Sequence, residues 1–209
     1  MAYNPGGQPS AGMTVPAPVS SVYCVPYVAQ FEIDQKVLTV SGGRFTIKDA
    51  RGTLLFDVKH KNPLALHTRR VVYDASGNAL VLLKRKMATM HERWSAYRGE
   101  SDDSDSNMLF SMAKSSLIQL TPSYDIFLGT NKTSTPDFKV KGDIFQHHYS
   151  ILYNGTPVAE VRKKVNMSSI FVGKDQYGVT VYPGVDHAFI ASVIVIMDQV
   201  KQAATQGGD

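Results

Sequence analysis

The stretch VDHAFIASVIVIMDQVKQ, residues 185–202, decides the fold of this protein. Residues 188–197 are apolar except for Ser192, so the segment has no polar face. Its β-branched residues would also suit a strand, and periodicity cannot separate the two structures when both faces are apolar. The length of the segment and the capping residue Asp186 favour a helix over about 186–201. Such a helix is apolar all round and must therefore be buried on every side.

The chain before this helix has the pattern of antiparallel β structure. Three stretches repeat one unit, in which a turn of Asp or Asn with Gly separates two runs of alternating apolar residues: RFTIKDARGTLLFDVK (44–59), RVVYDASGNALVLLKRK (70–86) and YSILYNGTPVAEVRKK (149–164). Further strands are predicted at WSAYRG (94–99), NMLFSMAKS (107–115), LIQLT (117–121), YDIFLG (124–129), DFKVKG (137–142) and YGVTVYP (177–183). A mainly β fold follows, a closed antiparallel β-barrel of about twelve strands that encloses the hydrophobic C-terminal helix.

The domain organisation predicted from composition has three parts. Residues 1–22 carry no charged side chain and include four prolines, which predicts a disordered Pro/Gly-rich tail. Residues 23–201 form one barrel domain, and 202–209 form a flexible C-terminus. The turn carboxylates Asp49 and Asp74 are expected to bond their own backbone rather than to act in catalysis.

Composition also bounds the setting of the protein. The single cysteine, Cys24, cannot close an internal disulfide and fits a reducing compartment. The N-terminal residues lack the basic start and apolar stretch of a signal peptide. We therefore expect a cytoplasmic protein that could be peripheral at a membrane, with entry to the nucleus left open.

Charge is distributed unevenly along the chain. The formal net charge is +4, yet residues 59–98 hold nine basic side chains and only two acidic ones, Asp74 and Glu92. An acidic stretch with Glu100, Asp102 and Asp103 follows and partly compensates. Two interpretations stay open: a patch for an anionic partner such as nucleic acid or lipid phosphate, or strand faces that are charged because they meet water.

The sequence lacks the residue spacings of known catalytic and metal-binding motifs. No nucleophile elbow, Walker loop or Rossmann glycine pattern occurs. A calcium-loop start at Asp103 has Met108 where the loop requires Gly and Lys114 where it requires Glu. His147 and His148 are adjacent, so on a strand they would point to opposite faces. We predict no catalytic residue, no metal site, no cofactor and no enzyme activity.

Three stretches resemble the plant LURP-one-related family: KRKMATMHERWSAYRG (84–99), YDIFLGTNKTSTPDFKVKGD (124–143) and SIFVGKDQYGVTVYPGVDHAFIASVIVIMDQV (169–200). With VYCVPY (22–27), the likeness covers the chain after the tail. The resemblance implies the tubby C-terminal-like fold, a closed β-barrel around a hydrophobic helix, and a distant relation to phospholipid scramblases and to phosphoinositide-binding tubby proteins. It also implies an association with plant defence. Two carboxylates, Asp175 and Asp186, are too few for the calcium site proposed in scramblases.

The leading functional hypothesis is a non-enzymatic module that docks on anionic membrane lipid, including phosphoinositide. The candidate lipid-binding residues form two basic trios, each following a hairpin strand: Lys84, Arg85 and Lys86, and Arg162, Lys163 and Lys164. The two trios could occupy equivalent rims of the barrel. The alternatives are a nucleic-acid-binding transcription regulator that would stack bases on Trp94 and Tyr97, and a scramblase-like lipid protein.

Overall fold

A computed structural model describes residues 13–36, 44–61, 69–86, 93–115, 122–163 and 177–206. The described strands are β1 (Ala29–Lys36), β2 (Arg44–Asp49), β3 (Leu54–His60), β4 (Arg69–Asp74), β5 (Ala79–Lys86), β6 (Arg93–Arg98), β7 (Met108–Lys114), β8 (Ser123–Leu128), β9 (Phe138–Asp143), β10 (His148–Tyr153), β11 (Thr156–Lys163) and β12 (Tyr177–Val181). Two 3₁₀ turns, η1 (Ser21–Tyr23) and η2 (Asp105–Asn107), and the helix α1 (His187–Gln206) complete the described elements. The strand predicted over 117–121 falls outside the described residues.

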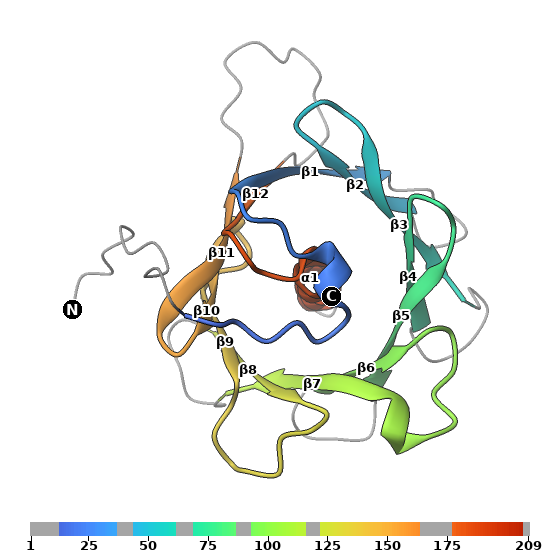
Figure 1. Ribbon diagram of the computed structural model, residues 1–209, viewed down its shortest axis with the longest axis vertical. Coiled ribbons are helices and arrows are strands. Elements are labelled where there is room, and N and C mark those ends of the chain that lie inside the picture. Colours follow the sequence, from blue (N-terminus) through green and yellow to red (C-terminus); the bar gives the residue numbers. More distant parts are fainter. Residues whose placement is uncertain are drawn as a thin grey trace.

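The twelve strands close into one antiparallel barrel around α1 (Figure 1). Each strand pairs with its neighbours in the sequence, and β1 pairs with β12 to complete the ring. Closure leaves the twelve described strands without a free sheet edge, which a chain with so many strands would otherwise have to protect. The predicted fold class, a closed barrel around a C-terminal helix, is confirmed.

The predicted hairpin turns form as their sequences require. Gly52 and Gly77 have φ angles of 82° and 85°, and Asn154 and Gly155 supply two successive positive φ values of 48° and 81°. The Asp49 carboxylate accepts the backbone N–H of the second and fourth residues after it, at 2.9 and 2.8 Å. These local bonds lower the pKa of Asp49, and the hydrogen bond from the backbone N–H of Thr53 is the main cause. The turn carboxylates are structural, as predicted.

The helix α1 is surrounded by the barrel along its apolar length. From Ala188 to Met197 no residue exposes more than 1% of its surface, and Ser192 bonds its Oγ to the Ala188 carbonyl at 2.8 Å. By length and composition α1 could cross a bilayer, but inside the barrel its apolar side chains already contact strands. The helix ends at Gln206, five residues later than predicted, so the C-terminal residues 202–206 are helical. Residues 207–209 fall outside the described part.

The predicted tail boundary at residue 22 is wrong for residues 13–22. Residues 13–23, which we call the plug, lie across one opening of the barrel (Figure 1). Val19 exposes 4% of its surface and joins the main core, with Met13 and Val15 packed against it. The prediction failed because it counted apolar residues along the plug alone, whereas the barrel supplies the apolar surface for Val19. Residues 1–12 fall outside the described residues.

The buried carboxylate of Asp186 joins the plug to α1. Its Oδ2 accepts the backbone N–H of Val19 and Ser20 at 2.7 and 3.0 Å, and its Oδ1 accepts those of Ala188 and Phe189 at 3.0 and 3.1 Å. The predicted capping role of Asp186 is confirmed. Burial raises the pKa of Asp186, and the four N–H groups oppose that shift.

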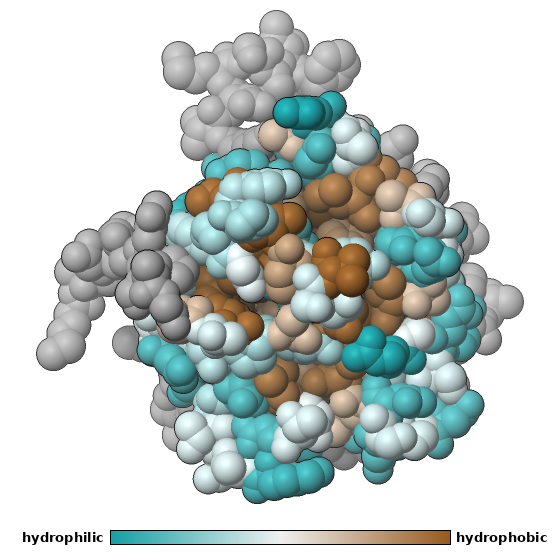
Figure 2. Space-filling model, viewed as in Figure 1, coloured by the Kyte–Doolittle hydropathy of each residue, from teal (hydrophilic) through white to brown (hydrophobic). Residues whose placement is uncertain are grey.

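Alternation of strand direction defines two ends of the barrel. Odd-numbered strands start at the plug end and finish at the opposite end, which we call the far end. The helix α1 starts beside the plug at Asp186 and therefore runs toward the far end. Figure 2 shows the plug end, where apolar residues gather over the middle of the barrel and hydrophilic residues border them.

Candidate functional site

Basic side chains gather at the far end of the barrel. They occupy the last residues of odd-numbered strands, the first residues of even-numbered strands and the last turns of α1. We call this set the basic rim; its described members include Lys59, Lys61, Arg69, Arg70, Lys84, Arg85, Lys86, Arg93, Lys114, Lys141, Arg162, Lys163 and Lys201. Acidic residues on the same half are fewer, namely Asp125, Asp143, Glu160 and Asp198 among the described side chains. Glu160 lies 3.5 Å from Arg162, and Asp57 at the middle of β3 lies 3.7 Å from Lys59.

The plug end has the opposite character. Its turns and connections carry Asp49, Asp74, Asp103, Asp105 and Asp137, against the basic residues Lys48, Arg51, Arg98 and Lys132. Glu100 and Asp102 belong to a connection that starts at this end but reaches back to Lys61, Arg69 and Lys84 of the basic rim. The charge asymmetry seen along the sequence thus becomes an asymmetry along the barrel axis. A molecule with this distribution would present its far end to an anionic surface.

The described members of the two predicted basic trios lie at the same end but on opposite sides of the barrel. β5 and β11 both run toward the far end, and five strands separate them in either direction around the ring (Figure 1). The outer wall near one trio cannot contact a surface together with the outer wall near the other. Only an approach with the far end facing the surface brings both trios to it.

Lys84 is held by an acidic residue of the β6–β7 connection. Its Nζ lies 2.5 Å from Asp102 Oδ2, and Arg69 Nη2 lies 3.2 Å from the same oxygen. The hydrogen bond from Lys84 is the main cause that lowers the pKa of Asp102. Lys61 bonds the backbone carbonyl of Glu100 in the same connection. The acidic stretch therefore neutralises part of the basic rim directly.

The remaining members of the trios divide between the two faces of the wall. Lys86 is exposed, whereas Arg85 pairs in register with the buried Trp94 and stands on the row facing the interior. Lys163 stands on the inner row opposite Tyr177, and Arg162 is on the outer row. Lys164 falls outside the described residues.

Inside the far end, a polar cluster surrounds the last turns of α1. His147 stacks on Tyr177 with ring centroids 3.9 Å apart, and its Nε2 lies 2.9 Å from Lys201 Nζ. Burial lowers the pKa of Arg70, and the charge of Asp198 on α1 opposes that shift. The change from apolar to polar side chains along α1 thus coincides with the end of the barrel interior.

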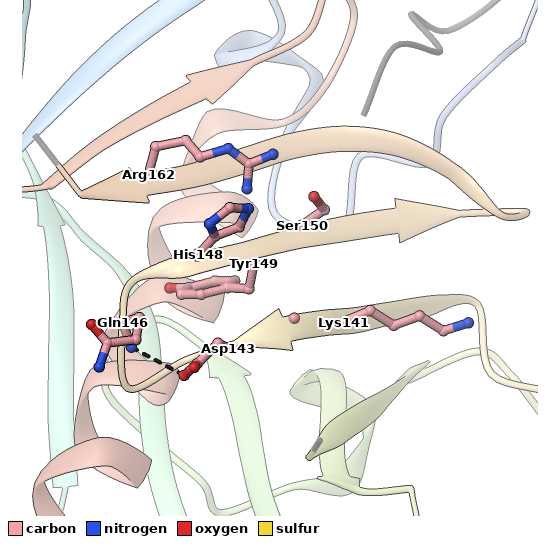
Figure 3. A pocket seen from close by; sticks show the side chains of 8 residues that line it. Lys141, Asp143, Gln146, His148, Tyr149, Ser150 and Arg162 are labelled. Atoms are coloured by element: carbon pink, nitrogen blue, oxygen red, sulfur yellow. Dashed lines mark hydrogen bonds between the residues drawn. The ribbon is translucent and has the colours of Figure 1, made fainter. Parts of the chain in front are cut away.

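A pocket of about 440 Å³ opens on the outer wall of β9, β10 and β11, next to the basic rim (Figure 3). Its lining comprises Lys141, Gly142, Asp143, Gln146, His148, Tyr149, Ser150 and Arg162. Figure 3 shows the Arg162 guanidinium pointing toward the His148 ring, with Asp143 and Gln146 at the β9–β10 turn. Arg162 was predicted from the sequence, whereas Lys141 and His148 were not.

The guanidinium of Arg162 is only weakly engaged. Its Nη2 lies 3.5 Å from Glu160 Oε1, at the limit of a hydrogen bond. Its Nη1 is buried and has no hydrogen-bond partner among the described residues. A buried donor left without a partner is costly, so this nitrogen is suited to an incoming acceptor.

The geometry gives less support to base stacking, to metal binding and to a site inside the barrel. Trp94 and Tyr97, the predicted base-stacking residues, expose only 2% and 5% of their surfaces. Within the described part of the chain, no three His, Cys, Asp or Glu side chains lie close enough together to hold a metal ion. The helix fills the interior, where it and the inner faces of the strands form the main core cluster, and a smaller cluster of Val71, Leu82 and Tyr97 is separate from it.

Comparison with known proteins places this architecture in a family. The family model described as LURP-one-related matches residues 29–198, from the first residue of β1 into α1. The chain belongs to the LURP-one-related family. The resemblance predicted from the sequence is therefore confirmed at the level of the family.

Relatives of this LURP-one-related chain match it over nearly its whole length. It is 41% identical to Protein LURP-one-related 15 of Arabidopsis thaliana over 208 residues, covering 96% of this chain and 94% of the relative. Identity to Protein LURP1 of the same plant is 40% over 190 residues, covering 88% and 90%. An X-ray structure of an Arabidopsis thaliana protein, 34% identical, superimposes with a TM-score of 0.69 over 91% of this chain and 99% of that one.

Proposed function

We propose that this LURP-one-related protein is a non-enzymatic module that docks its far end on an anionic membrane surface, in a cytoplasmic setting connected with plant defence. The observation that carries the proposal is the axial charge separation, with the basic rim at one end and acidic turns at the other. Each basic residue close to an anionic membrane contributes about 1 kcal/mol, so a rim of several residues reaches useful affinity despite a net charge of only +4.

Docking by the far end also explains why the two basic trios lie on opposite sides of the barrel. A ring of charges around an opening contacts a flat surface at several points, whereas one side wall would present only one trio. The likeness to tubby proteins and scramblases, which the sequence resemblance implied, points to the same class of partner. Nucleic acid has less support, because the aromatic residues proposed for stacking are buried.

Vesicle sedimentation with matched charge reversals tests the proposal. Lys86→Glu with Arg93→Glu reverses an exposed cross-strand pair of the basic rim. Arg51→Glu with Lys132→Glu makes the same change in charge at exposed turns of the plug end. On phosphatidylcholine vesicles containing phosphatidylserine, we expect the rim variant to lose at least tenfold in partitioning and the plug-end variant to lose less than twofold.

Two outcomes would overturn the proposal. One is wild-type protein that does not sediment with anionic vesicles at low salt. The other is an equal loss for the two double variants, which would mean that net charge alone governs binding. Retention on double-stranded DNA with a steep salt dependence, in the absence of vesicle binding, would instead favour the nucleic-acid alternative.

A further inference from the structure

We infer that the pocket on β9–β11 is a binding site for a phosphate monoester carried on a hydroxylated ring. If the ring belongs to a lipid headgroup, the inference rests on the proposed function; if the ligand is soluble, it does not. It assigns a specific ligand chemistry to one place on the wall, whereas docking by the basic rim needs no pocket.

The cationic side of the pocket comes from strand register. Tyr149 pairs with Val161 and Asp143 pairs with His148, so one outer row crosses the wall from Asp143 through His148 to Arg162. On the far side of Arg162 the paired residue is Gly178, which has no side chain to fill the space. Arg162 and His148 thus stand beside each other on a wall with room around the guanidinium.

An anion satisfies this arrangement better than a neutral ligand does. The buried Nη1 of Arg162 has no hydrogen-bond partner within the described chain, and its Nη2 has only the long contact to Glu160. A guanidinium offers paired N–H donors that match the oxygens of a phosphate. The imidazole of His148, directly beside it, adds an N–H donor in either charge state. Lys141 on β9 adds an exposed positive charge to the pocket lining.

The opposite side of the pocket is suited to hydroxyl groups. Asp143 Oδ1 accepts the backbone N–H of Phe145 and of Gln146 at 2.9 and 3.1 Å, which fixes the carboxylate at the turn. Its Oδ2 remains an acceptor for a ligand O–H, and the Gln146 side chain also lines the pocket (Figure 3). A carboxylate would repel a bare phosphate but would accept hydrogen bonds from a polyol.

The size of the pocket agrees with this chemistry. A volume of about 440 Å³ is far more than one phosphate ion requires and falls within the range of small-molecule sites. A phosphorylated ring the size of inositol would place its phosphate at Arg162 and His148 and its hydroxyls at Asp143 and Gln146. The same chemistry occurs in a membrane phosphoinositide and in a soluble inositol phosphate.

Calorimetric titration of the full chain with myo-inositol 1,4,5-trisphosphate tests the site, with myo-inositol and inorganic phosphate as comparison ligands. We expect the trisphosphate to bind at least tenfold more tightly than either comparison ligand. Arg162→Gln should weaken trisphosphate binding at least tenfold, whereas Lys86→Gln, which removes one basic-rim charge outside the pocket, should change it less than twofold. Equal melting temperatures of the three proteins establish that folding is unchanged.

Asp143→Asn separates a ring-binding pocket from simple charge attraction. Asn keeps an Oδ1 acceptor for the turn but removes a negative charge. Attraction by charge alone predicts tighter trisphosphate binding by this variant, whereas loss of a hydroxyl acceptor predicts weaker binding. We expect weaker binding; tighter binding, or equal weakening by Arg162→Gln and Lys86→Gln, would overturn the inference.

The two proposals fail separately. Anionic vesicles that bind the protein while the trisphosphate does not would overturn the pocket and leave docking intact. Trisphosphate binding that needs Arg162, without binding to phosphatidylserine vesicles, would support the pocket and overturn docking by the basic rim. Competition by the trisphosphate against phosphoinositide vesicles distinguishes the sources: competition means that the lipid headgroup enters the pocket, and its absence restricts the pocket to the soluble ligand.

Discussion

The two ends of the barrel are built from different interactions. At the plug end, the chain closes the opening with buried contacts: Val19 enters the core, and the Asp186 carboxylate bonds both the plug and the start of α1. At the far end, charged side chains surround the last turns of the same helix. Changes at the plug end should therefore affect stability with little effect on anion binding, and changes in the basic rim should do the reverse.

The largest effect is expected between the two ends, where α1 is enclosed on all sides. Ile194 is fully buried, so Ile194→Asp would place an unpaired charge in the core. Such a group costs several kcal/mol, a large part of the roughly 5–15 kcal/mol that stabilises an ordinary domain. We expect the purified variant to be largely unfolded in buffer without lipid, as measured by near-UV circular dichroism and thermal melting.

A matched substitution on the same helix isolates the effect of burial. Ala204 is exposed near the C-terminal end of α1, so Ala204→Asp introduces the same side chain in water. Its expected cost is below about 1 kcal/mol, from the unfavourable interaction of an anion with the end of the helix dipole. Unchanged melting of Ile194→Asp would contradict the enclosure of α1.

The next largest effect is expected at the plug. Asp186→Asn retains one amide oxygen to cap α1 but directs an NH₂ group toward the N–H groups of Val19 and Ser20. Hydrogen bonds to charged groups contribute about 1.5–3 kcal/mol each, so we expect a loss of about 2–3 kcal/mol in chemical denaturation. Binding of folded protein to anionic vesicles should stay within twofold of wild type. A loss of vesicle binding without a loss of stability would break the distinction between the two ends.

The sequence predicts the hairpins and the helix of the barrel better than it predicts the plug. The hairpins and the helix follow from local signals, namely the Asn154–Gly155 turn and the uniformly apolar stretch 188–197. The role of Val19 could not be predicted, because its backbone N–H bonds Asp186, 167 residues away along the chain, and its carbonyl accepts a hydrogen bond from Arg98, 79 residues away. Local composition describes the plug as a tail; only the closed barrel gives it a surface on which to pack.

The pocket could not be predicted from the sequence because it depends on the register between β10 and β11. Counting outward from the Asn154–Gly155 turn places His148 opposite Val161. In the structure the register shifts between Ile151 and Leu152: Leu152 pairs with Pro157 and Ile151 with Ala159, so Val158 is the extra residue next to Pro157 and His148 stands beside Arg162 instead. Pro157 was the available signal, since proline lacks the N–H that a regular ladder needs and is found at bulges. A shift of one residue therefore decided which side chains share the outer face.

The smallest effect on stability is expected at the ion pairs of Asp102 with Lys84 and Arg69, where the acidic β6–β7 connection meets the basic rim. Because the hydrogen bond from Lys84 lowers the pKa of Asp102 in the folded state, this carboxylate stabilises the protein above the ordinary carboxyl range. That stabilisation is lost as the pH falls below about 4 and through the lower folded-state value. Ion pairs in partly exposed positions contribute up to about 1 kcal/mol. We expect Asp102→Asn to melt slightly below wild type at pH 7, and the difference to close as the pH is lowered toward 3.

The same substitution sharpens the comparison of the two ends through binding. Asp102→Asn leaves Lys84 and Arg69 without their acidic partner, so the basic rim gains an effective positive charge while the fold loses a little stability. Sedimentation with phosphatidylserine vesicles should rise by up to about fivefold, consistent with about 1 kcal/mol per added charge near the membrane. The control Asp105→Asn removes an exposed carboxylate of the same connection that makes no ion pair with a described residue of the basic rim, and it should leave both the melting temperature and the sedimentation unchanged. Equal gains for the two variants would show that net charge, rather than the release of Lys84 and Arg69, controls the approach to the membrane.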